Sequence, residues 1–306
     1  MKMKKQSVVL VVILSMLSVL LGSPWADKTM ASEIGQDIRI AADIIVSTEW
    51  LQKNNELVKV IDTRKNGFDE GHIPGAVHLP YTELNDPNHP IEDYMISKKD
   101  FEKKMRTLGV RNDQTVVVYD DGRSPYAARL FLALDYYGHE DVRLLDGGIT
   151  AWTESGKELA QDVDEYKKGN FKASLKENFL VDKDFVKNAI GKEGVVLLDV
   201  RSPEEYRGEE KRAKRGGHIP TAVNLEWKNT IKPEGIPYLK PLHQLEQQFE
   251  ELGVTKDKTI IIYCHTALRT AHTFVVLRLL GFENLHVYEG SWAEWGNDPD
   301  TPIDKP

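Results

Sequence analysis

The sequence predicts an α/β protein built from two tandem copies of one domain, each a parallel β-sheet flanked by helices. The 306 residues are enough for two domains. Short β-branched runs alternate with helical stretches, which is the pattern of parallel strands covered by helices. The same motifs also occur twice in the same order, and such an internal repeat indicates duplicated domains.

The repeated motifs align the two halves of the chain. A strand ending in Asp-x-Arg leads to Gly-His-Ile-Pro and Ala-Val at Asp62–Val77 in the first half and at Asp199–Val223 in the second. Leu-Gly-Val and a β-branched strand then follow, and the next residue is Asp120 in the first half and Cys264 in the second. The first copy therefore carries an aspartate where the second carries a cysteine.

Three main strands are expected in each copy, because the apolar β-branched runs are short and bounded by charged or turn residues. In chain order they are Val58–Ile61, Val116–Tyr119, Val142–Leu145, Val195–Leu198, Thr259–Tyr263 and Leu285–Tyr288. Ser97 is expected to cap a helix over Lys98–Leu108. Gly138 and Gly281 are expected to end the later apolar helices.

The repeats also predict the limits of the two domains. The N-terminal copy is expected over residues 40–160 and the C-terminal copy over residues 177–306. The charged, aperiodic residues 161–176 between them predict a connection that lies over the surface.

Residues 1–31 have the features of a secretory signal peptide. Three lysines precede an apolar stretch over Val8–Leu21, and Thr29–Ala31 offers small residues for cleavage. The stretch is shorter than the roughly 20 residues of a membrane span, and an uncleaved N-terminal anchor is the alternative. We therefore expect an extracytoplasmic protein, whether secreted, periplasmic or attached to the cell envelope, with a membrane contact only if the segment stays uncleaved.

The composition argues against two kinds of partner. The formal net charge is −8, and cleavage after Ala31 would remove more lysines than acidic residues, so nucleic acid is not an expected partner. The nine histidines lack ligand spacing and have no cysteine partners, so no metal is expected. A single cysteine cannot form an internal disulfide, which is the usual use of cysteine in exported proteins.

The single cysteine lies at a junction of strand, loop and helix. Cys264 follows the run Thr259–Tyr263 and precedes His265–Thr270, which leads into an apolar helix. Backbone N–H groups and the positive end of a helix dipole stabilise a thiolate there, and ligands bind at the carboxyl ends of parallel strands. A cysteine that only packs in the core is the alternative. We interpret Cys264 as the reactive nucleophile.

These motifs together resemble the tandem-domain rhodanese family of thiosulfate and 3-mercaptopyruvate sulfurtransferases. The resemblance covers roughly residues 40–300 and includes Glu289–Trp295 near the end of the chain. In this family the N-terminal copy has usually lost its cysteine and the C-terminal copy is catalytic, which matches Asp120 and Cys264. Two tandem rhodanese-like domains are therefore expected.

The resemblance implies a sulfurtransferase. Cys264 would take a sulfane sulfur from a small anionic donor, thiosulfate or 3-mercaptopyruvate, and hold it as a persulfide. The sulfur would then pass to cyanide, a small thiol or a thioredoxin-like acceptor, which predicts ping-pong kinetics and requires no cofactor or metal. Backbone N–H groups of the loop are expected to cradle the persulfide charge. The loop residues concerned are Thr266, Ala267, Leu268 and Thr270.

Three further residues are candidates for substrate binding. Arg269 is expected to clamp the anionic donor, because a guanidinium offers two hydrogen-bond donors to a sulfonate or carboxylate. Arg201 resembles the family's second active-site arginine, and a salt bridge with Glu70 or Glu205 is the alternative for this repeated arginine. His265 could favour the thiolate or could point at solvent.

The loop departs from the family at two positions. Familiar thiosulfate-specific and mercaptopyruvate-specific members have glycine where this chain has Ala267, and commonly threonine where it has Arg269. Alanine can impede a positive φ angle. The arginine suits a strongly anionic donor, which favours thiosulfate over 3-mercaptopyruvate.

Two other functions compete with this one. Rhodanese-fold phosphatases place five residues between cysteine and arginine, but only four intervene here, so the narrower loop disfavours phosphate. A sulfur-carrier or binding module with little turnover is the alternative from another class, and the acidic N-terminal copy favours it.

Two more features have competing interpretations. Lys211–Arg215 could guide anions to the site or form a solvated loop. The tryptophans at repeated positions are expected to fill cores rather than to bind ligands. They are Trp152, Trp292 and Trp295.

Overall fold

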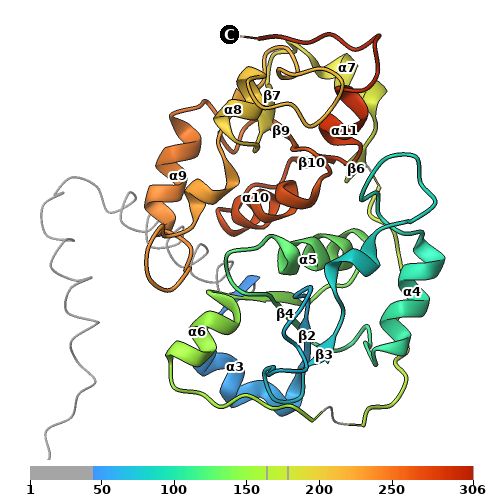
Figure 1. The fold of residues 1–306 in the computed structure, drawn as a ribbon, viewed down its shortest axis with the longest axis vertical. Helices are drawn as coiled ribbons and strands as arrows, with labels where there is room; N and C mark the ends of the chain where they lie inside the picture. Colours follow the sequence, from blue (N-terminus) through green and yellow to red (C-terminus); the bar gives the residue numbers. More distant parts are fainter. Residues whose placement is uncertain (1–43, 163–164, 178, 306) are drawn as a thin grey trace, which may run out of the picture. The chain divides into compact units, whose positions relative to one another are not determined.

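The computed structural model describes residues 44–162, 165–177 and 179–305 (Figure 1). The expected signal segment, residues 1–31, lies outside these ranges, so its structure is not part of the description. Within the described ranges, no helix is both long and apolar enough to cross a bilayer.

Each copy contains a five-stranded sheet, and every strand pair in both sheets is parallel. The strand order is β1-β5-β4-β2-β3 in the N-terminal copy and β6-β10-β9-β7-β8 in the C-terminal copy, so the two sheets have the same topology. The first sheet contains β1 (Ile45–Val46), β2 (Lys59–Asp62), β3 (Val77–His78), β4 (Val116–Tyr119) and β5 (Val142–Leu145). The second contains β6 (Leu180–Val181), β7 (Val195–Asp199), β8 (Val223–Asn224), β9 (Thr259–Tyr263) and β10 (Leu285–Tyr288).

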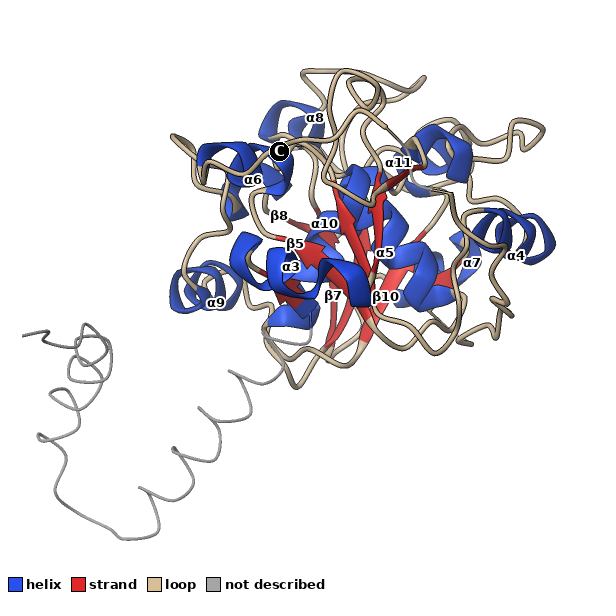
Figure 2. Ribbon diagram, turned by 90° about the horizontal axis from the view of Figure 1, so that it is seen from below, coloured by secondary structure: helices blue, strands red, loops and turns tan. Residues whose placement is uncertain are grey.

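Helices surround the strands of both copies (Figure 2). In the N-terminal copy they are α3 (Thr48–Asn54), α4 (Lys98–Thr107), α5 (Tyr126–Tyr136) and α6 (Gly148–Glu154), with 3₁₀ turns η1 (Asn55–Leu57) and η2 (Tyr81–Leu84). In the C-terminal copy they are α7 (Lys183–Ala189), α8 (Pro203–Arg207), α9 (Leu242–Glu250), α10 (Leu268–Leu279) and α11 (Ser291–Trp295), with the 3₁₀ turn η3 (Trp227–Thr230).

The six expected strands are confirmed to within one residue at each end. The capping prediction is also confirmed, because the Ser97 hydroxyl accepts a hydrogen bond from the Asp100 N–H at the start of α4. Gly138 and Gly281 follow α5 and α10 with φ of 82° each, a left-handed conformation that glycine adopts without a Cβ clash. The four edge strands β1, β3, β6 and β8 were not expected.

Alternate residues of the central strands face two different cores. Val116 and Val118 of β4 lie in a core shared by both copies, whereas Val117 and Tyr119 face a core confined to the N-terminal copy. β9 of the C-terminal copy divides its side chains in the same way. The shared core includes α5 and α10, which pack side by side (Figure 1). Each sheet is therefore buried on both faces, as parallel sheets usually are.

The connection between the copies lies mostly over the surface, as predicted, since most of its described residues are exposed, but two apolar residues are buried. Phe171 and Ala173 are buried, and Phe171 packs edge-on against Phe101 of α4. The Arg106 side chain also donates to the Phe171 carbonyl over 2.7 Å. Two apolar residues in this charged stretch thus anchor the connection in the shared core, because burying them is more favourable than leaving them in water.

Candidate active site

Cys264 follows the last residue of β9 and is fully buried. Its N–H donates to the Ser291 hydroxyl over 3.3 Å, and its carbonyl accepts from the Trp292 N–H over 3.0 Å. The next carbonyl, that of His265, accepts from Ala293 over 2.8 Å. The start of α11 therefore holds the loop that carries the thiol.

The loop turns into α10 through Ala267, whose φ is 57°. The expectation that this position needs a positive φ angle is confirmed, and the alanine adopts it at a cost that glycine would avoid. Because α10 begins at Leu268, the N–H groups of its first turn have no acceptor within the helix. The Thr270 hydroxyl in this turn is buried and has no hydrogen-bond partner in the described part of the chain. These groups are available to an anion held at the thiol.

Arg269 forms a partly buried ion pair with Glu205 of α8. Its Nη1 and Nη2 donate to the two carboxylate oxygens over 2.5 and 2.9 Å. Burial alone would lower the pKa of Arg269, but the bond to Glu205 and the charge of the nearby Cys264 raise it above its usual value. The guanidinium is therefore a permanent cation beside the thiol, and sequence reasoning missed its partner.

Arg201 is held by a buried ion pair at the end of β7. It is buried, donates to both oxygens of Asp199 and to the Gly217 carbonyl, and lies 4.3 Å from the centre of the Trp292 ring. Arg64 makes the same contacts with Asp62 and Gly71 in the copy without a cysteine. The ion pair thus braces each strand end, and its partner is an aspartate rather than Glu70 or Glu205.

His265 does not point at solvent, since the residue is only 6% exposed. Burial, with the charges of Arg212 and Arg269, lowers its pKa to about 4. The imidazole is therefore neutral at neutral pH and adds no positive charge beside the thiol. Its Nδ1 atom is buried and has no hydrogen-bond partner among the described residues.

A cavity of about 530 Å³ opens at this loop. His265, Thr266, Leu268 and Arg269 line it from the C-terminal copy, together with α8, Arg212 and the region of η3. The remaining lining comes from the N-terminal copy: Tyr81, Glu92, Asp93, Pro125 and Tyr126. Both copies therefore line this cavity, and the contribution of the N-terminal copy was not predicted from the sequence.

The N-terminal copy also holds the Cys264 loop directly. The Thr266 hydroxyl donates to the Asp93 carboxylate over 3.0 Å, and Asn85 donates to the other oxygen of Asp93 over 2.6 Å. Asp93 has a φ of 56°, so this connection between β3 and α4 adopts a strained backbone to reach the loop.

A buried ion pair joins the copies behind the loop. Arg129 of α5 donates to both oxygens of Glu289, the residue after β10, over 2.6 and 3.2 Å, and to the Asp93 carbonyl over 2.9 Å. Glu289 also accepts from the Met95 N–H over 2.9 Å. Burial alone would lower the pKa of Arg129, but Glu289, Asp93 and Cys264 raise it. Arg129 is thus a second cation close to the thiol.

The corresponding site of the N-terminal copy is filled. Asp120 accepts hydrogen bonds from the N–H groups of Gly122 and Ala127 over 2.7 and 2.9 Å, so its carboxylate occupies its own loop. Burial raises the pKa of Asp120 to about 7. A side chain at Gly122 would meet Pro237 of the other copy within 2.6 Å, which shows how closely this site is covered.

In the basic segment Lys211–Arg215, some residues lie in a solvated loop and one lines the cavity. Lys211 and Lys214 are exposed, as in a solvated loop. Arg212 lines the cavity, whereas Arg215 donates to the Trp295 and Thr301 carbonyls and fixes the C-terminal segment. Trp152, Trp292 and Trp295 are all buried in the cores, as expected.

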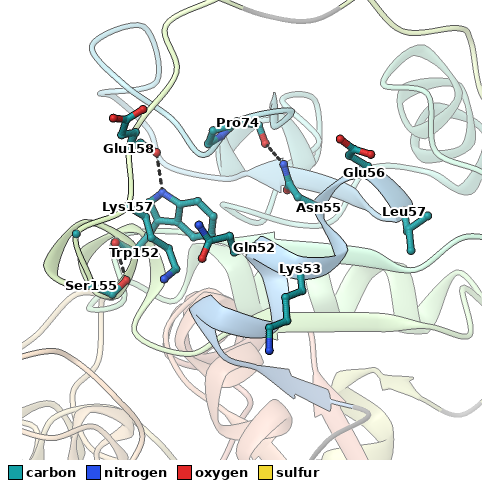
Figure 3. Close-up of a pocket in the computed structure, with 11 residues that line it drawn as sticks. Gln52, Lys53, Asn55, Glu56, Leu57, Pro74, Trp152, Ser155, Lys157 and Glu158 are labelled. Carbon is teal, nitrogen blue, oxygen red and sulfur yellow. Dashed lines mark hydrogen bonds between the residues drawn. The ribbon is translucent and has the colours of Figure 1, made fainter. Parts of the chain in front are cut away.

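A larger hollow of about 950 Å³ lies on the N-terminal copy between α3 and the end of α6 (Figure 3). Several of its polar groups bond to one another, as in the bond of 2.9 Å from the Trp152 indole to the Glu158 carbonyl. The residues described as lining it include neither cysteine nor histidine. Volume alone therefore does not make it the reactive site.

Comparison with known proteins agrees with this geometry. The rhodanese-like domain model matches twice, at residues 47–155 and 182–298. The sulfur carrier protein TtuD of Thermus thermophilus is 39% identical over 280 residues, covering 86% of this chain and 97% of TtuD. The thiosulfate sulfurtransferase of Azotobacter vinelandii is 36% identical, covering 81% and 91% of the two chains.

Solved structures show the same similarity. An anaerobic ergothioneine biosynthesis enzyme from Chlorobium limicola, in complex with trimethyl histidine, is 25% identical, with a TM-score of 0.77 over 86% of this chain and 70% of that one. An EanB complex with ergothioneine covalently linked to a persulfide cysteine is 26% identical, with a TM-score of 0.78 over 85% of this chain and 70% of the other. On the matched domains, the shared topology and these relatives, the chain belongs to the rhodanese-like family, as a tandem member with two such domains.

Proposed function

We propose that this protein is a thiosulfate sulfurtransferase that carries the sulfane sulfur as a persulfide on Cys264. The observation that carries the proposal is the placement of the single, buried thiol in the loop that leads into α10, where the residues after it, His265, Thr266 and Arg269, line a cavity built by both copies. The relatives named thiosulfate sulfurtransferase support the donor, and the persulfide cysteine of the EanB complex supports the intermediate.

Arg269 remains able to bind the donor despite its ion pair. Glu205 contacts the end of the guanidinium through Nη1 and Nη2. Nε and the second hydrogen of Nη2 make no hydrogen bond among the described residues, so the side of the guanidinium can still clamp two sulfonate oxygens. Glu205 thus fixes the orientation of Arg269 rather than occupying every donor.

The two half-reactions follow from this arrangement. The Cys264 thiolate attacks the outer sulfur of thiosulfate, a new S–S bond forms, and the bond within thiosulfate breaks with its electron pair leaving on sulfite. A nucleophile then attacks the outer sulfur, and the electron pair of the enzyme's S–S bond returns to Cys264. Because His265 is neutral, the compensating positive charge comes from Arg269, Arg129 and the helix terminus.

Intact mass spectrometry tests the proposal. Thiosulfate is expected to add the mass of about one sulfur atom to the wild type and none to Cys264→Ser, and cyanide is expected to remove it as thiocyanate. Arg269→Lys keeps the charge but loses the two-donor clamp, so its KM for thiosulfate is expected to rise about tenfold, in line with about 1.4 kcal/mol. A mass gain with 3-mercaptopyruvate but not with thiosulfate would identify 3-mercaptopyruvate as the donor.

A sulfur carrier with little turnover is the second candidate, because a relative with 39% identity is named as one. Both functions predict the persulfide, but only the enzyme releases thiocyanate over many cycles. A single burst of one product per protein would favour the carrier.

We also propose export through residues 1–31, on the lysines and apolar stretch described above. N-terminal sequencing of protein from the cell exterior and from the membrane fraction distinguishes a cleaved signal from a retained anchor.

A further inference from the structure

We propose that the acceptor at this site is a small aminothiol, that is, a thiol carrying a positively charged amine. The proposal rests on the sulfur transfer proposed above and adds the chemical class of the second substrate. It is carried by the cavity wall that the N-terminal copy contributes.

This wall combines aromatic rings with carboxylates. Tyr81 and Tyr126 stack with their ring centres 4.0 Å apart, and both line the cavity together with Glu92 and Asp93. Burial raises the pKa of Tyr81, and Tyr126, Asp93 and Glu92 raise it further, so the carboxylates lie close to the ring. We call these four residues the acidic–aromatic wall. Carboxylates and aromatic faces together attract an ammonium group.

The lining from the C-terminal copy carries charges of both signs: Arg212, Lys228 and Arg269, with Glu205, Glu210 and Glu226. Of these, Arg212 and Arg269 act on His265, the neighbour of the thiol. The wall contacts the loop close to the thiol, since Asp93 accepts a hydrogen bond from Thr266, which is two residues after Cys264 in the chain. A short molecule with its sulfur at Cys264 and an amine at the wall would therefore meet Arg269 near its sulfur and carboxylates near its amine.

Glu92 is the member of the wall that is free to pair with an incoming amine. Asp93 is occupied by Thr266 and Asn85, and Glu205 is occupied by Arg269. Glu92 forms no ion pair within the described ranges and is exposed at the cavity. An ammonium group at this position would pair with Glu92 without displacing an existing contact.

His265 supplies an independent indication that a ligand completes the site. It lines the cavity, is only 6% exposed, and its Nδ1 has no partner among the described residues. An unprotonated imidazole nitrogen can accept a hydrogen bond from the thiol or the amine of an incoming molecule. An acceptor bound against the wall would provide the partner that this ring lacks.

The transfer then balances in atoms and charge. The acceptor's sulfur bonds to the outer sulfur of the persulfide, and the S–S bond to Cys264 breaks with its electron pair remaining on Cys264 as thiolate. The acceptor's thiol proton ends on the transferred sulfur. The products are the acceptor's hydropersulfide and the regenerated thiolate.

The test uses three thiols that differ in charge and little in size: 2-aminoethanethiol, 2-mercaptoethanol and mercaptoacetate. The persulfide is formed with thiosulfate, confirmed by mass, freed of donor, and discharged by each thiol in a single turnover. The variants are Glu92→Gln and Glu92→Lys. The control is Glu83→Gln, which removes the same charge from the nearby turn η2, where Glu83 pairs with Lys104 outside the cavity. Dividing each variant's rate by that of the wild type cancels the intrinsic reactivity of each thiol.

The expected result is a loss of preference for the cationic thiol. The ratio of the 2-aminoethanethiol rate to the mercaptoacetate rate should fall about threefold in Glu92→Gln and about tenfold in Glu92→Lys. It should be unchanged in Glu83→Gln, and added salt should narrow the difference. An unchanged ratio in Glu92→Lys would overturn the proposal.

Failure of the donor and failure of the acceptor give different results. If thiosulfate produces no mass gain, the proposed donor is wrong, and the persulfide is formed with inorganic polysulfide for the same discharge assay. The rate ratio then still decides the acceptor. If neither donor loads Cys264, both proposals are wrong.

Discussion

Removing Arg129 is expected to destabilise the whole protein, because the side chains of Arg129 and Glu289 are each only 1% exposed. Arg129→Met leaves the Glu289 carboxylate buried with no cation, and breaking a buried pair in this way costs about 3–5 kcal/mol. Glu289→Gln leaves Arg129 unpaired at a similar cost. The double variant removes both charges and should recover most of the lost stability, since methionine and glutamine fill about the same volume as the arginine and glutamate that they replace.

The free energy of unfolding in urea, measured for the wild type, both single variants and the double variant, gives the coupling between the two residues. A coupling of at least about 2 kcal/mol is expected for two buried charges in contact. Lys104→Met serves as the control, because its partner Glu83 is about half exposed and surface pairs contribute little. If the losses in the two single variants simply add in the double variant, the account of a desolvated pair between the copies is refuted.

Three further outcomes are expected. Ala267→Gly should have a free energy of unfolding in urea about 2 kcal/mol higher than that of Ala271→Gly. Both alanines are fully buried, but Ala267 has a positive φ, which suits glycine, whereas Ala271 lies within a helix, which glycine destabilises. Equal stabilities would contradict this. The pKa of Asp120 is raised to about 7 in the folded protein, so folding favours the protonated carboxyl. The free energy of unfolding is therefore expected to fall as the pH rises from about 4 to about 7, by about 1.4 kcal/mol for each unit of pKa shift. Asp120→Asn should therefore reduce the loss of stability between pH 5 and pH 8, and an unchanged slope would show that this carboxyl is ionised throughout. His265→Asn should leave the pH profile of persulfide formation by thiosulfate unchanged between pH 5.5 and 8, because the pKa of His265 is already lowered to about 4; a profile that shifts would mean the ring is charged in that step.

The central strands could be predicted from the sequence because they are long enough to show a pattern. β4 is buried along its whole length and β9 from Ile260 onward, as expected of strands covered on both faces. The edge strands β1, β3, β6 and β8 have two residues each, so no alternation of side chains marks them. Their existence depends on pairing with the central strands.

The junction of strand, loop and helix at Cys264 could also be predicted, because these elements are contiguous in the chain. Its environment could not. Asp93 lies 173 residues from Thr266 along the chain, and Arg129 lies 160 residues from Glu289. Such contacts arise from the packing of one copy on the other, and local spacing carries no signal for them. The repeat of Arg201 at Arg64 was the one sequence feature that pointed to its structural position.

The covering of each loop by the other copy constrains how this chain can change in evolution. Residues Gly235–Leu239 of the C-terminal copy bond to Arg123 and Asp146, as Asp93 and Met95 of the N-terminal copy bond to Thr266 and Glu289. The copy without a cysteine thus forms part of the cavity wall, and a gene fragment encoding only the other copy would leave α10 and the Cys264 loop without these contacts. The first repeat therefore cannot be discarded, although its cavity-lining residues can change while the Cys264 loop stays intact.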